Sequence, residues 1–314
     1  MEKMDCPLVG VIILHWGSLE NTLECIESVS NSGYKKTIII LVDNYPEDRI
    51  DQSILKDKNK IYYLEAPTNL GYCEGNNAGI KKAKKFGAEY ILLLNNDTII
   101  DKVMIGLSVK YMKENEDVAV ISPKIYFYKE PKIINIAGGE IDINTGNISY
   151  IGWNEEDKGQ YDNVRRITWV QGCAIFARTE LFTKIGMFNE KLFCYGEDVD
   201  ISRRIILGGM KIIYYPKAKV WHKCESLEVN SRGMLQTPLS AYYIWRNRLY
   251  NLKRYMKKGY IKGYCLYCFA FIRRLAAFSL KHRKSNISKA MIFGIIDGLL
   301  DRMGKREYKC FWKG

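Results

Sequence analysis

Two hydrophobic patterns alternate along the first hundred residues. Four apolar, largely β-branched runs have the composition of buried strands, at residues 8–14, 36–42, 61–64 and 90–94. Residues 20–30 carry Leu23, Ile26 and Val29 at helical spacing, and residues 76–86 are also predicted to be a helix. This alternation predicts βαβ units and therefore a mostly parallel central sheet with helices on both faces.

The pattern changes between residues 133 and 170, where Gly, Asn and Asp predict hairpins or a long excursion. The elements expected after it are a strand at 168–177, a helix at 180–185, a helix at 198–207 and a strand at 211–215. Three helices are expected in the last part of the chain, at 242–256, 261–279 and 289–303. We therefore expect an α/β domain over residues 1–240 and a helical extension over residues 241–314.

Composition indicates a folded protein without a membrane-spanning segment. Of the 314 residues, 47% are apolar and 26% charged, which excludes wholesale disorder. The longest uncharged stretch of the hydrophobic C-terminal part covers only residues 263–272, far short of a bilayer span. The first residues mix charges and run into a predicted strand, so no secretory signal is expected. These features predict a cytoplasmic protein.

The excess of positive over negative charge lies in the helical extension. Residues 241–314 contain 18 Lys and Arg against 3 Asp and Glu, whereas residues 1–240 contain 30 against 32. A basic extension favours an anionic partner, either nucleic acid or a phospholipid surface, although a solvated basic face is the simpler alternative. Aromatic side chains and basic ends in 261–279 favour the membrane interface, with packing on the main domain or a homodimer contact as alternatives.

The nine cysteines show no disulfide framework. Their number is odd and their spacing irregular, which is typical of reduced thiols that pack in a cytosolic protein. Cys265 and Cys268 form a single CxxC without a second pair, so a helix face is predicted there rather than a zinc site.

Polar residues follow three of the predicted strands. His15 follows the first, Asp43 and Asn44 follow the second, and residues 95–97 follow the strand at 90–94. Ligands of parallel α/β sheets bind beyond the carboxyl ends of the strands, so these side chains predict one crevice. A single Asp in such a place is often only a turn former or a helix cap.

Ordered motifs resemble those of family 2 glycosyltransferases over residues 8–255. They lie at residues 8–14, 42–44, 68–72, 75–79, 92–98, 172–178, 186–190, 195–200, 208–209 and 215–222. Gly138-Gly139, residues 159–162 and residues 243–247 are similar to the rhamnosyltransferase-type members. The resemblance implies the GT-A, or nucleotide-diphospho-sugar transferase, fold. It also implies a nucleotide-binding half at about 1–100 and an acceptor-binding half at about 101–240.

The implied activity is an inverting transfer of a sugar from a pyrimidine nucleotide to a hydroxyl group. Rhamnose from a dTDP-sugar is favoured, and UDP-galactose, UDP-glucose and UDP-N-acetylhexosamine are alternative donors. The implied acceptor is a saccharide or lipid-linked glycan of cell-surface polysaccharide synthesis, used at the cytoplasmic membrane face to which the basic extension would bind. Alternatives are a nucleotidyltransferase, an inactive partner subunit and a protein that binds nucleic acid through the extension; we do not expect nucleic acid as a partner.

The resemblance assigns donor and metal roles to the first half and to two later residues. Asp97 is the last residue of the family's metal motif, and His222 matches a position that completes a Mg²⁺ or Mn²⁺ site. The motif has Asn95 and Asn96 where the family often has acids. The expected donor contacts are Leu14, Asp43 at the pyrimidine base, Asn69, Gly71, Asn77, Asn95, Asn96 and Asp97, with Arg246 at the diphosphate.

The catalytic and acceptor roles fall in the second half. Asp198 matches the second acid of the family's Glu-Asp motif and is the expected general base, at a helix N-terminus whose dipole favours the ionised carboxylate. Glu197 is expected to orient the acceptor or the base, and Asp200 to cap the helix or pair with Arg203 or Arg204. The expected acceptor contacts are Trp169, Gln171, Gly172, Glu197 and Asp198.

Overall fold

The computed structural model describes residues 6–55, 60–142, 146–224, 237–255, 260–277 and 285–306. Its strands are β1 (Val9–His15), β2 (Thr37–Asp43), β3 (Ile61–Glu65), β4 (Tyr90–Asn95), β5 (Thr98–Ile100), β6 (Val118–Phe127), β7 (Ile133–Ile136), β8 (Gly139–Ile141), β9 (Ile148–Tyr150), β10 (Glu155–Glu156), β11 (Arg165–Ile167), β12 (Ala174–Arg178) and β13 (Lys211–His222). Its helices are α1 (Leu19–Ser30), α2 (Gly71–Lys85), α3 (Met104–Glu114), α4 (Leu181–Lys184), α5 (Glu197–Leu207), α6 (Pro238–Tyr255), α7 (Tyr260–Ala276) and α8 (Ser285–Leu299), with short 3₁₀ turns η1 (Gln52–Leu55) and η2 (Glu190–Leu192).

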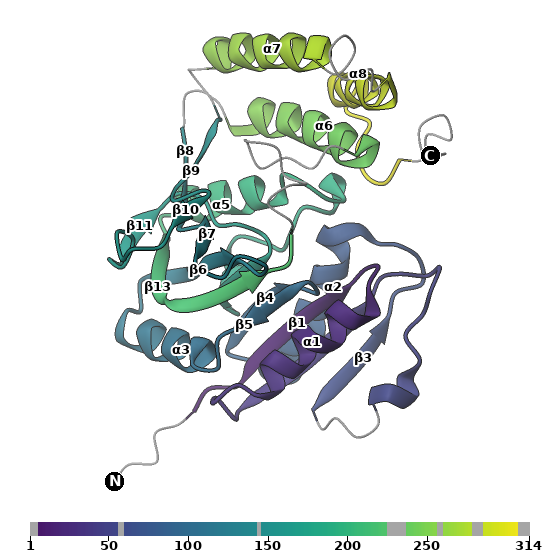
Figure 1. Ribbon diagram of the computed structural model, residues 1–314. Coiled ribbons are helices and arrows are strands. Elements are labelled where there is room, and N and C mark those ends of the chain that lie inside the picture. Colours follow the sequence, from purple (N-terminus) through teal and green to yellow (C-terminus); the bar gives the residue numbers. More distant parts are fainter. Residues whose placement is uncertain are drawn as a thin grey trace.

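The first half of the chain forms the parallel part of the central sheet, in the order β3-β2-β1-β4 (Figure 1). Both faces of β1 are buried because helices cover both sides. Val11 and Ile13 pack with α1 and α3, whereas Ile12 and Leu14 pack with α2. This two-sided burial explains why the strands read as continuous apolar runs.

The second half makes the sheet mixed. β12 runs antiparallel between β4 and β6, and β13 runs parallel to β6 while it pairs antiparallel with β5 and β11. The predicted parallel arrangement is therefore confirmed for β1 to β4 and holds again for the pair of β6 and β13, whereas the other strand pairs of the second half are antiparallel. The hairpin-rich region predicted between 133 and 170 holds β7 to β11. The fold is the GT-A type, with helices at its C-terminal end.

Several boundaries differ from the predictions. α3 and the long strand β6 were not predicted at all, and β6 carries Lys124 in a fully buried position, which interrupts the apolar pattern. β13 continues past Pro216 to His222, because a register shift between Tyr215 and Lys219 lets it keep pairing with β6. α2 begins at Gly71 rather than at residue 76.

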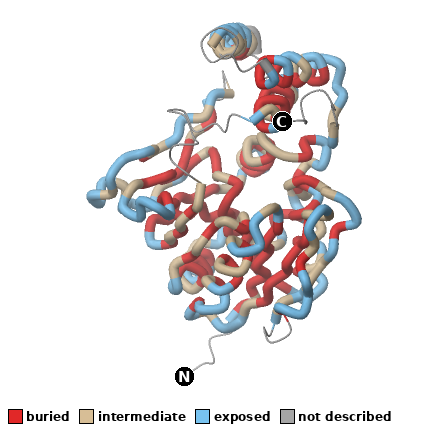
Figure 2. The backbone as a smooth tube through the Cα atoms, turned by 45° about the vertical axis from the view of Figure 1, so that its right-hand side comes forward, coloured by how far each residue is buried: buried red, intermediate tan, exposed pale blue. Residues whose placement is uncertain are grey.

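The three C-terminal helices pack together and α6 lies against the catalytic end of the main body (Figures 1 and 2). Phe193 of the main body belongs to the same buried cluster as Tyr243 and Trp245 of α6. Packing on the main body, one of the alternatives left open by the sequence, is therefore observed for α6. α7 leaves Leu266, Phe269 and Ile272 exposed. Within the described residues, no helix has the length and hydropathy to cross a bilayer.

The cysteines are all free thiols among the described residues, but they do not all pack. Cys25, Cys73 and Cys173 are buried, whereas Cys6, Cys265 and Cys268 are exposed. The CxxC pair lies on α7, as predicted for a helix face. Cys310 and the last two residues of the helix expected at 261–279 lie outside the described residues.

Candidate active site

The carboxyl ends of the parallel strands meet at one edge of the sheet, as the polar strand ends predicted. His15 is directly opposite Asp43 on β2, and Leu14 is directly opposite Asn95 on β4. The residues at this edge nevertheless have different roles. Two of them form an ion pair, and others make hydrogen bonds that hold the neighbouring loops in place.

Asp97 and His222 form the ion pair. β5 pairs with the end of β13 so that Thr98 lies opposite His222, which brings the Asp97 carboxylate to 3.3 Å from His222 Nε2. Burial alone would lower the pKa of His222, but the Asp97 carboxylate overrides it and raises that pKa well above its ordinary value. Burial likewise opposes ionisation of Asp97, and His222 lowers its pKa in spite of that.

The Asp97–His222 pair has the chemistry of a partial divalent-cation site. Asp97 Oδ1 and His222 Nδ1 are buried without a hydrogen bond of standard geometry. The distance of 3.3 Å between Asp97 Oδ1 and His222 Nε2 is close to the roughly 3 Å that separates neighbouring ligands of an octahedral ion bound at about 2.1 Å. The described residues contain no cluster of three or more such ligands. The residues present therefore fit an ion that takes its remaining ligands from substrate phosphate and water.

Asn95 and Asn96, the other residues of this motif, support the loops. The Asn96 side chain is largely buried and donates to the Trp16 carbonyl at 3.1 Å and to Thr22 Oγ1 at 2.9 Å, so it holds the loop after β1. The Asn95 backbone pairs with Cys173 and accepts a bond from Thr98 Oγ1.

Asp43, expected at the pyrimidine base, is fully buried and engaged inside the protein. Its carboxylate accepts bonds from Tyr63 Oη at 2.6 Å and from the Ile50 and Tyr45 N–H groups, and it also contacts Arg49. Burial would raise the pKa of Asp43, but these bonds outweigh it and lower that pKa. In this structure the carboxylate organises the loop after β2 rather than facing a crevice.

The loop before α2 is built by asparagines. The Asn69 carboxamide oxygen accepts from the Gly71 N–H at 2.8 Å, and Asn44 bridges Asn69, Leu70 and the Gly71 carbonyl. Gly71 has φ of +71°, and a Cβ there would lie 2.5 Å from the Phe193 ring. The loop before α2, which contains Asn69 and Gly71, therefore packs against Phe193 of the second half of the chain.

Two further donor candidates have structural positions. Asn77 is buried and its side chain bonds both the carbonyl and the N–H of Phe188, at 2.9 Å each. The Leu14 side chain is also buried, against Gly75 of α2. The structure therefore places both side chains in the packing between elements.

Arg246 does not reach toward a diphosphate. It is fully buried, and its guanidinium donates to the carbonyls of Gly304 at 2.6 Å and Leu192 at 2.9 Å and lies over the Tyr243 ring. Carbonyl oxygens already accept hydrogen bonds from this cation, so the structure does not favour the expected role as a charge partner of the diphosphate. Through its bond to Leu192, Arg246 connects α6 to the η2 turn.

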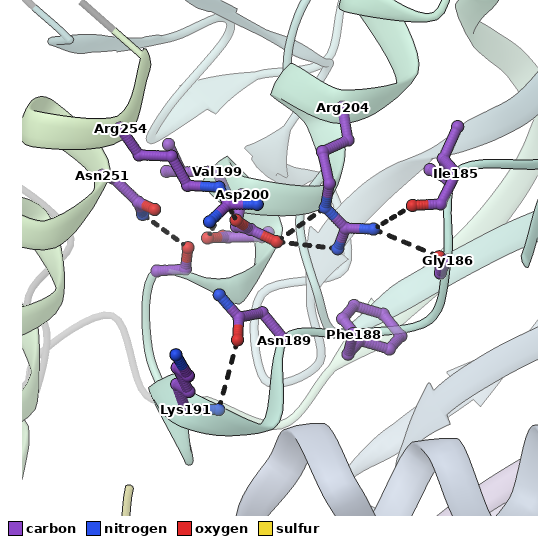
Figure 3. Close-up of polar contacts among 12 residues, drawn as sticks. Ile185, Gly186, Phe188, Asn189, Lys191, Val199, Asp200, Arg204, Asn251 and Arg254 are labelled. Carbon is purple, nitrogen blue, oxygen red and sulfur yellow. Dashed lines mark hydrogen bonds and ion pairs between the residues drawn. The ribbon is translucent and has the colours of Figure 1, made fainter. Parts of the chain in front are cut away.

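Residues 193–198, which end with the Glu-Asp motif, form a strained segment, called here the 193–198 loop. Phe193, Tyr195 and Gly196 have positive φ angles, which side chains other than glycine rarely adopt. Asn247 of α6 places its amide nitrogen within hydrogen-bond distance of the carbonyls of Leu192, Cys194 and Tyr195. Asn251 donates to the Gly196 carbonyl at 2.8 Å (Figure 3). The sequence analysis did not identify these asparagines; the only signal was their place in or near the 243–247 motif.

Glu197 and Asp198 begin α5 at the end of this loop. Burial raises the pKa of Glu197, and the neighbouring Asp198 raises it further. Burial also raises the pKa of Asp198, to about 6, although the Val199 N–H donates to Asp198 Oδ1 at 2.8 Å. The Trp169 indole favours the ionised form without meeting hydrogen-bond geometry. The backbone N–H groups at the start of α5 thus favour the ionised carboxylate, in the expected direction, but desolvation is the larger effect on the pKa.

Asp200 links α5 to the end of α6. One carboxylate oxygen accepts from Arg204, at 2.7 and 2.9 Å (Figure 3). The other accepts from Tyr255 Oη. Of the two partners expected for Asp200, the structure selects Arg204, which also donates to the Ile185 and Gly186 carbonyls. This network fixes the direction of α5 relative to α6.

A cavity of about 750 Å³ opens between the 193–198 loop, the β8–β9 hairpin and the helices α6 and α7. Three expected acceptor contacts, Trp169, Gln171 and Asp198, line it together. Gly172 lies beside it, with Glu197 Oε1 and Tyr72 Oη each 3.4 Å from where a Cβ would be. The lining also contains Tyr150, Arg203, Arg248, Phe269 and Arg273, which the sequence analysis did not propose as site residues. Aromatic walls around a carboxylate suit a sugar with reactive hydroxyl groups.

Comparisons with known proteins agree with this architecture. The chain is 22% identical to the low-salt glycan biosynthesis hexosyltransferase Agl10 of Haloferax volcanii, over 95% of this chain and 93% of that protein. It is 23% identical to the dTDP-rhamnosyl transferase RfbF of Shigella flexneri, over 80% of this chain and 81% of that protein.

Solved structures show the same fold. S. aureus TarS 1–349 in complex with UDP-GlcNAc has a TM-score of 0.58 at 16% identity, over 94% of this chain and 82% of that one. GalNAc-T7 with UDP, GalNAc and Mn²⁺ has a TM-score of 0.55 at 16% identity, over 69% of this chain and 43% of that one. Residues 10–177, more than half of the chain, match the family described as Glycosyl transferase family 2. The chain is a member of glycosyltransferase family 2, an enzyme that transfers a sugar from a nucleotide-sugar.

Proposed function

We propose that the enzyme inverts the anomeric carbon of a pyrimidine nucleotide-sugar as it transfers the sugar to a hydroxyl of a saccharide or lipid-linked glycan. The observation that carries the proposal is Asp198, a half-buried carboxylate that lines an aromatic cavity large enough for a sugar. dTDP-rhamnose is the donor to test first, since a relative from Shigella flexneri is named as a dTDP-rhamnosyl transferase. UDP-sugars are the alternatives, supported by the UDP-GlcNAc complex of a protein with the same fold.

Asp198 acts as the general base. Its carboxylate accepts the proton of the acceptor hydroxyl while the oxygen attacks the anomeric carbon opposite the departing diphosphate. Attack from that side inverts the configuration. Because burial raises the pKa of Asp198, it is a stronger base than an exposed aspartate and remains mostly ionised at neutral pH. Glu197, whose pKa is raised further, is protonated at that pH and donates a hydrogen bond that orients the acceptor.

Asp97 and His222 are the proposed protein ligands of Mg²⁺ or Mn²⁺. A bound divalent cation would neutralise the negative charge that develops on the leaving diphosphate. The structure of GalNAc-T7 with UDP and Mn²⁺ supports this role for the same fold. His222 must be neutral to bind the ion, so the ion replaces the His222 proton in the Asp97–His222 pair.

We also propose that the C-terminal helices hold the enzyme at the cytoplasmic membrane face. The exposed apolar residues of α7 and the excess of 15 positive charges in residues 241–314, obtained from 18 basic minus 3 acidic residues, support an interfacial position. A homodimer through the same apolar face is the alternative. Sedimentation with anionic vesicles, compared with light scattering of the protein alone, distinguishes the two.

A donor screen tests the proposed function. We expect one pyrimidine nucleotide-sugar among dTDP-rhamnose, UDP-galactose, UDP-glucose and UDP-N-acetylglucosamine to raise the melting temperature in the presence of Mn²⁺ or Mg²⁺, with GDP-mannose as the purine control. NMR of the transferred sugar then gives the anomeric configuration. Stabilisation by GDP-mannose alone, or a product with retained configuration, contradicts the proposal.

A further inference from the structure

Arg203 has an unusual position in the acceptor cavity. It lies on α5, five residues after Asp198, it lines the cavity, and only 9% of its surface is exposed. Its neighbour Arg204 takes the Asp200 carboxylate, which leaves Arg203 without an ion pair or hydrogen bond to any residue that the structure describes. Most of the side chain is covered, and the residue lines the cavity, so its guanidinium can reach a ligand there. A cation placed in this way without a protein carboxylate suits an anionic ligand.

A second arginine faces the same space. Arg248 of α6 lines the cavity and donates to the Asn147 side chain, but its Nε is buried without a partner among the described residues. Arg273 and Arg274 of α7 also belong to the lining, against only Asp142 and Asp198 as acids. Four arginines against two carboxylates give the cavity a net positive charge. Arginine forks suit phosphate oxygens in particular.

The wall nearest α7 is apolar. Leu252 and Trp245 of α6 and Leu266, Phe269 and Ala270 of α7 line this part of the cavity. Phe269 is 65% exposed, and Ile272, one turn further along α7, is 64% exposed. The apolar wall thus continues from the cavity onto the outer surface of α7. A ligand with a charged group beside Arg203 and an apolar chain can follow this path outward.

On the basis of the proposed function, we infer that the acceptor is a sugar esterified to a lipid phosphate or diphosphate, whose phosphate binds Arg203 and Arg248 and whose chain leaves along α7. The acceptor hydroxyl then lies toward Asp198, and the phosphate lies further along α5. A nucleotide diphosphate is a poorer match, because the lining contains none of the described residues of β1 to β4, nor Asp97 or His222. The anion that binds Arg203 is therefore the phosphate of the acceptor.

Binding of an alkyl diphosphate tests the inference apart from sugar transfer. The donor site is first saturated with UDP or dTDP and Mn²⁺, so that added phosphate cannot occupy it. Calorimetry then compares an alkyl diphosphate, inorganic diphosphate, and a neutral alkyl glucoside of the same chain length. We expect the alkyl diphosphate to bind most tightly, and Arg203→Gln to weaken it by about 10- to 100-fold, the loss of a charge-assisted bond. Arg166→Gln, an exposed arginine on β11, is the matched control.

Each alternative outcome overturns part of the inference. Equal binding of the alkyl diphosphate and the glucoside excludes a phosphate subsite, and so does undiminished binding to Arg203→Gln. Inorganic diphosphate that binds as tightly as its alkyl ester excludes the lipid and indicates a free phosphate ligand. If Arg203→Gln does not fold by circular dichroism, Arg248→Gln replaces it with the same expectation. A chain that binds the alkyl diphosphate but transfers no sugar contradicts the proposed function and not this subsite.

Discussion

The amide nitrogen of Asn247 lies 2.6 Å from the carbonyl oxygen of Tyr195. The bond joins α6 to a residue whose φ is +62°, two residues before the Glu-Asp pair. A strained backbone persists only where its surroundings hold it. α6 therefore holds the loop that carries the proposed base Asp198, in addition to its proposed position at the membrane.

Asn247→Ala is expected to lower kcat more than it raises the KM for the donor. The variant leaves the Leu192, Cys194 and Tyr195 carbonyls without their shared partner, so the 193–198 loop relaxes and Asp198 moves. A displacement of that kind costs roughly 100-fold in rate. Steady-state kinetics with both substrates measures the split. Asn115→Ala, at the end of α3, is a control; equal losses in both variants contradict a positioning role.

Asp198→Asn is expected to reduce sugar transfer by about 10²- to 10⁴-fold, the range for a general base. The change preserves the shape of the side chain and removes the proton acceptor. UDP or dTDP binding, measured by calorimetry, is the second readout and tests whether the site still forms. A variant that keeps more than a tenth of the rate assigns the base to another residue.

The rate should depend on pH through Asp198. The base must be ionised, so kcat/KM rises as pH increases through the pKa of the free enzyme, which burial raises to about 6 from an ordinary value of about 3.9. An exposed aspartate would leave kcat/KM flat in this range. The pH dependence of kcat/KM between pH 4.5 and 8 is the measurement; a limb centred near 4 contradicts the burial argument.

Asp97→Ala is expected to abolish the metal dependence of nucleotide binding. The wild-type enzyme should bind UDP or dTDP more tightly with Mn²⁺ than with EDTA, because Asp97 would hold an ion that neutralises the charge of the diphosphate. Calorimetry with and without the ion gives this ratio. Asp117→Asn, an exposed acid that pairs with Lys211, serves as the control. If the affinities with and without Mn²⁺ differ in Asp97→Ala by the same ratio as in the wild type, the ion binds at another site.

Asp43→Asn tests the structural role of the carboxylate after β2. The variant weakens the bonds from Tyr63, Ile50 and Arg49, and we expect it to lower the free energy of unfolding by about 1–3 kcal/mol at neutral pH. The native pKa of Asp43 is lowered, so its stabilisation is complete above the unfolded value of about 3.9 and is lost as pH falls through the native value. The difference in the free energy of unfolding between the two proteins, measured by urea titration, should therefore be smaller at pH 3 than at pH 7. A difference that is as large at pH 3 as at pH 7 contradicts this role.

The parallel half of the fold could be predicted from sequence because its signals are local. Strands covered on both faces need apolar side chains at every position, and the helices between them need one apolar face. The meeting of the strand ends at one edge could also be predicted, because parallel strands in register bring His15, Asp43 and Asn95 together there. β6 was missed because the buried Lys124 interrupts its apolar pattern and is paired with Asp157 and Asp162, more than thirty residues away.

By itself, the sequence determined the family and the parallel strands that precede Asp97, and it singled out Asp97 and Asp198 as the acids to test. Tertiary structure decided which polar residues remain available for chemistry. Asp43 and Arg246 are charged in the sequence and fully buried in the fold, where a hydroxyl, N–H groups or carbonyls occupy them. Arg203 and Arg204 are adjacent in the chain, yet only Arg204 has a carboxylate. The physical reason is that solvation and pairing depend on neighbours brought together by folding, which no local pattern records.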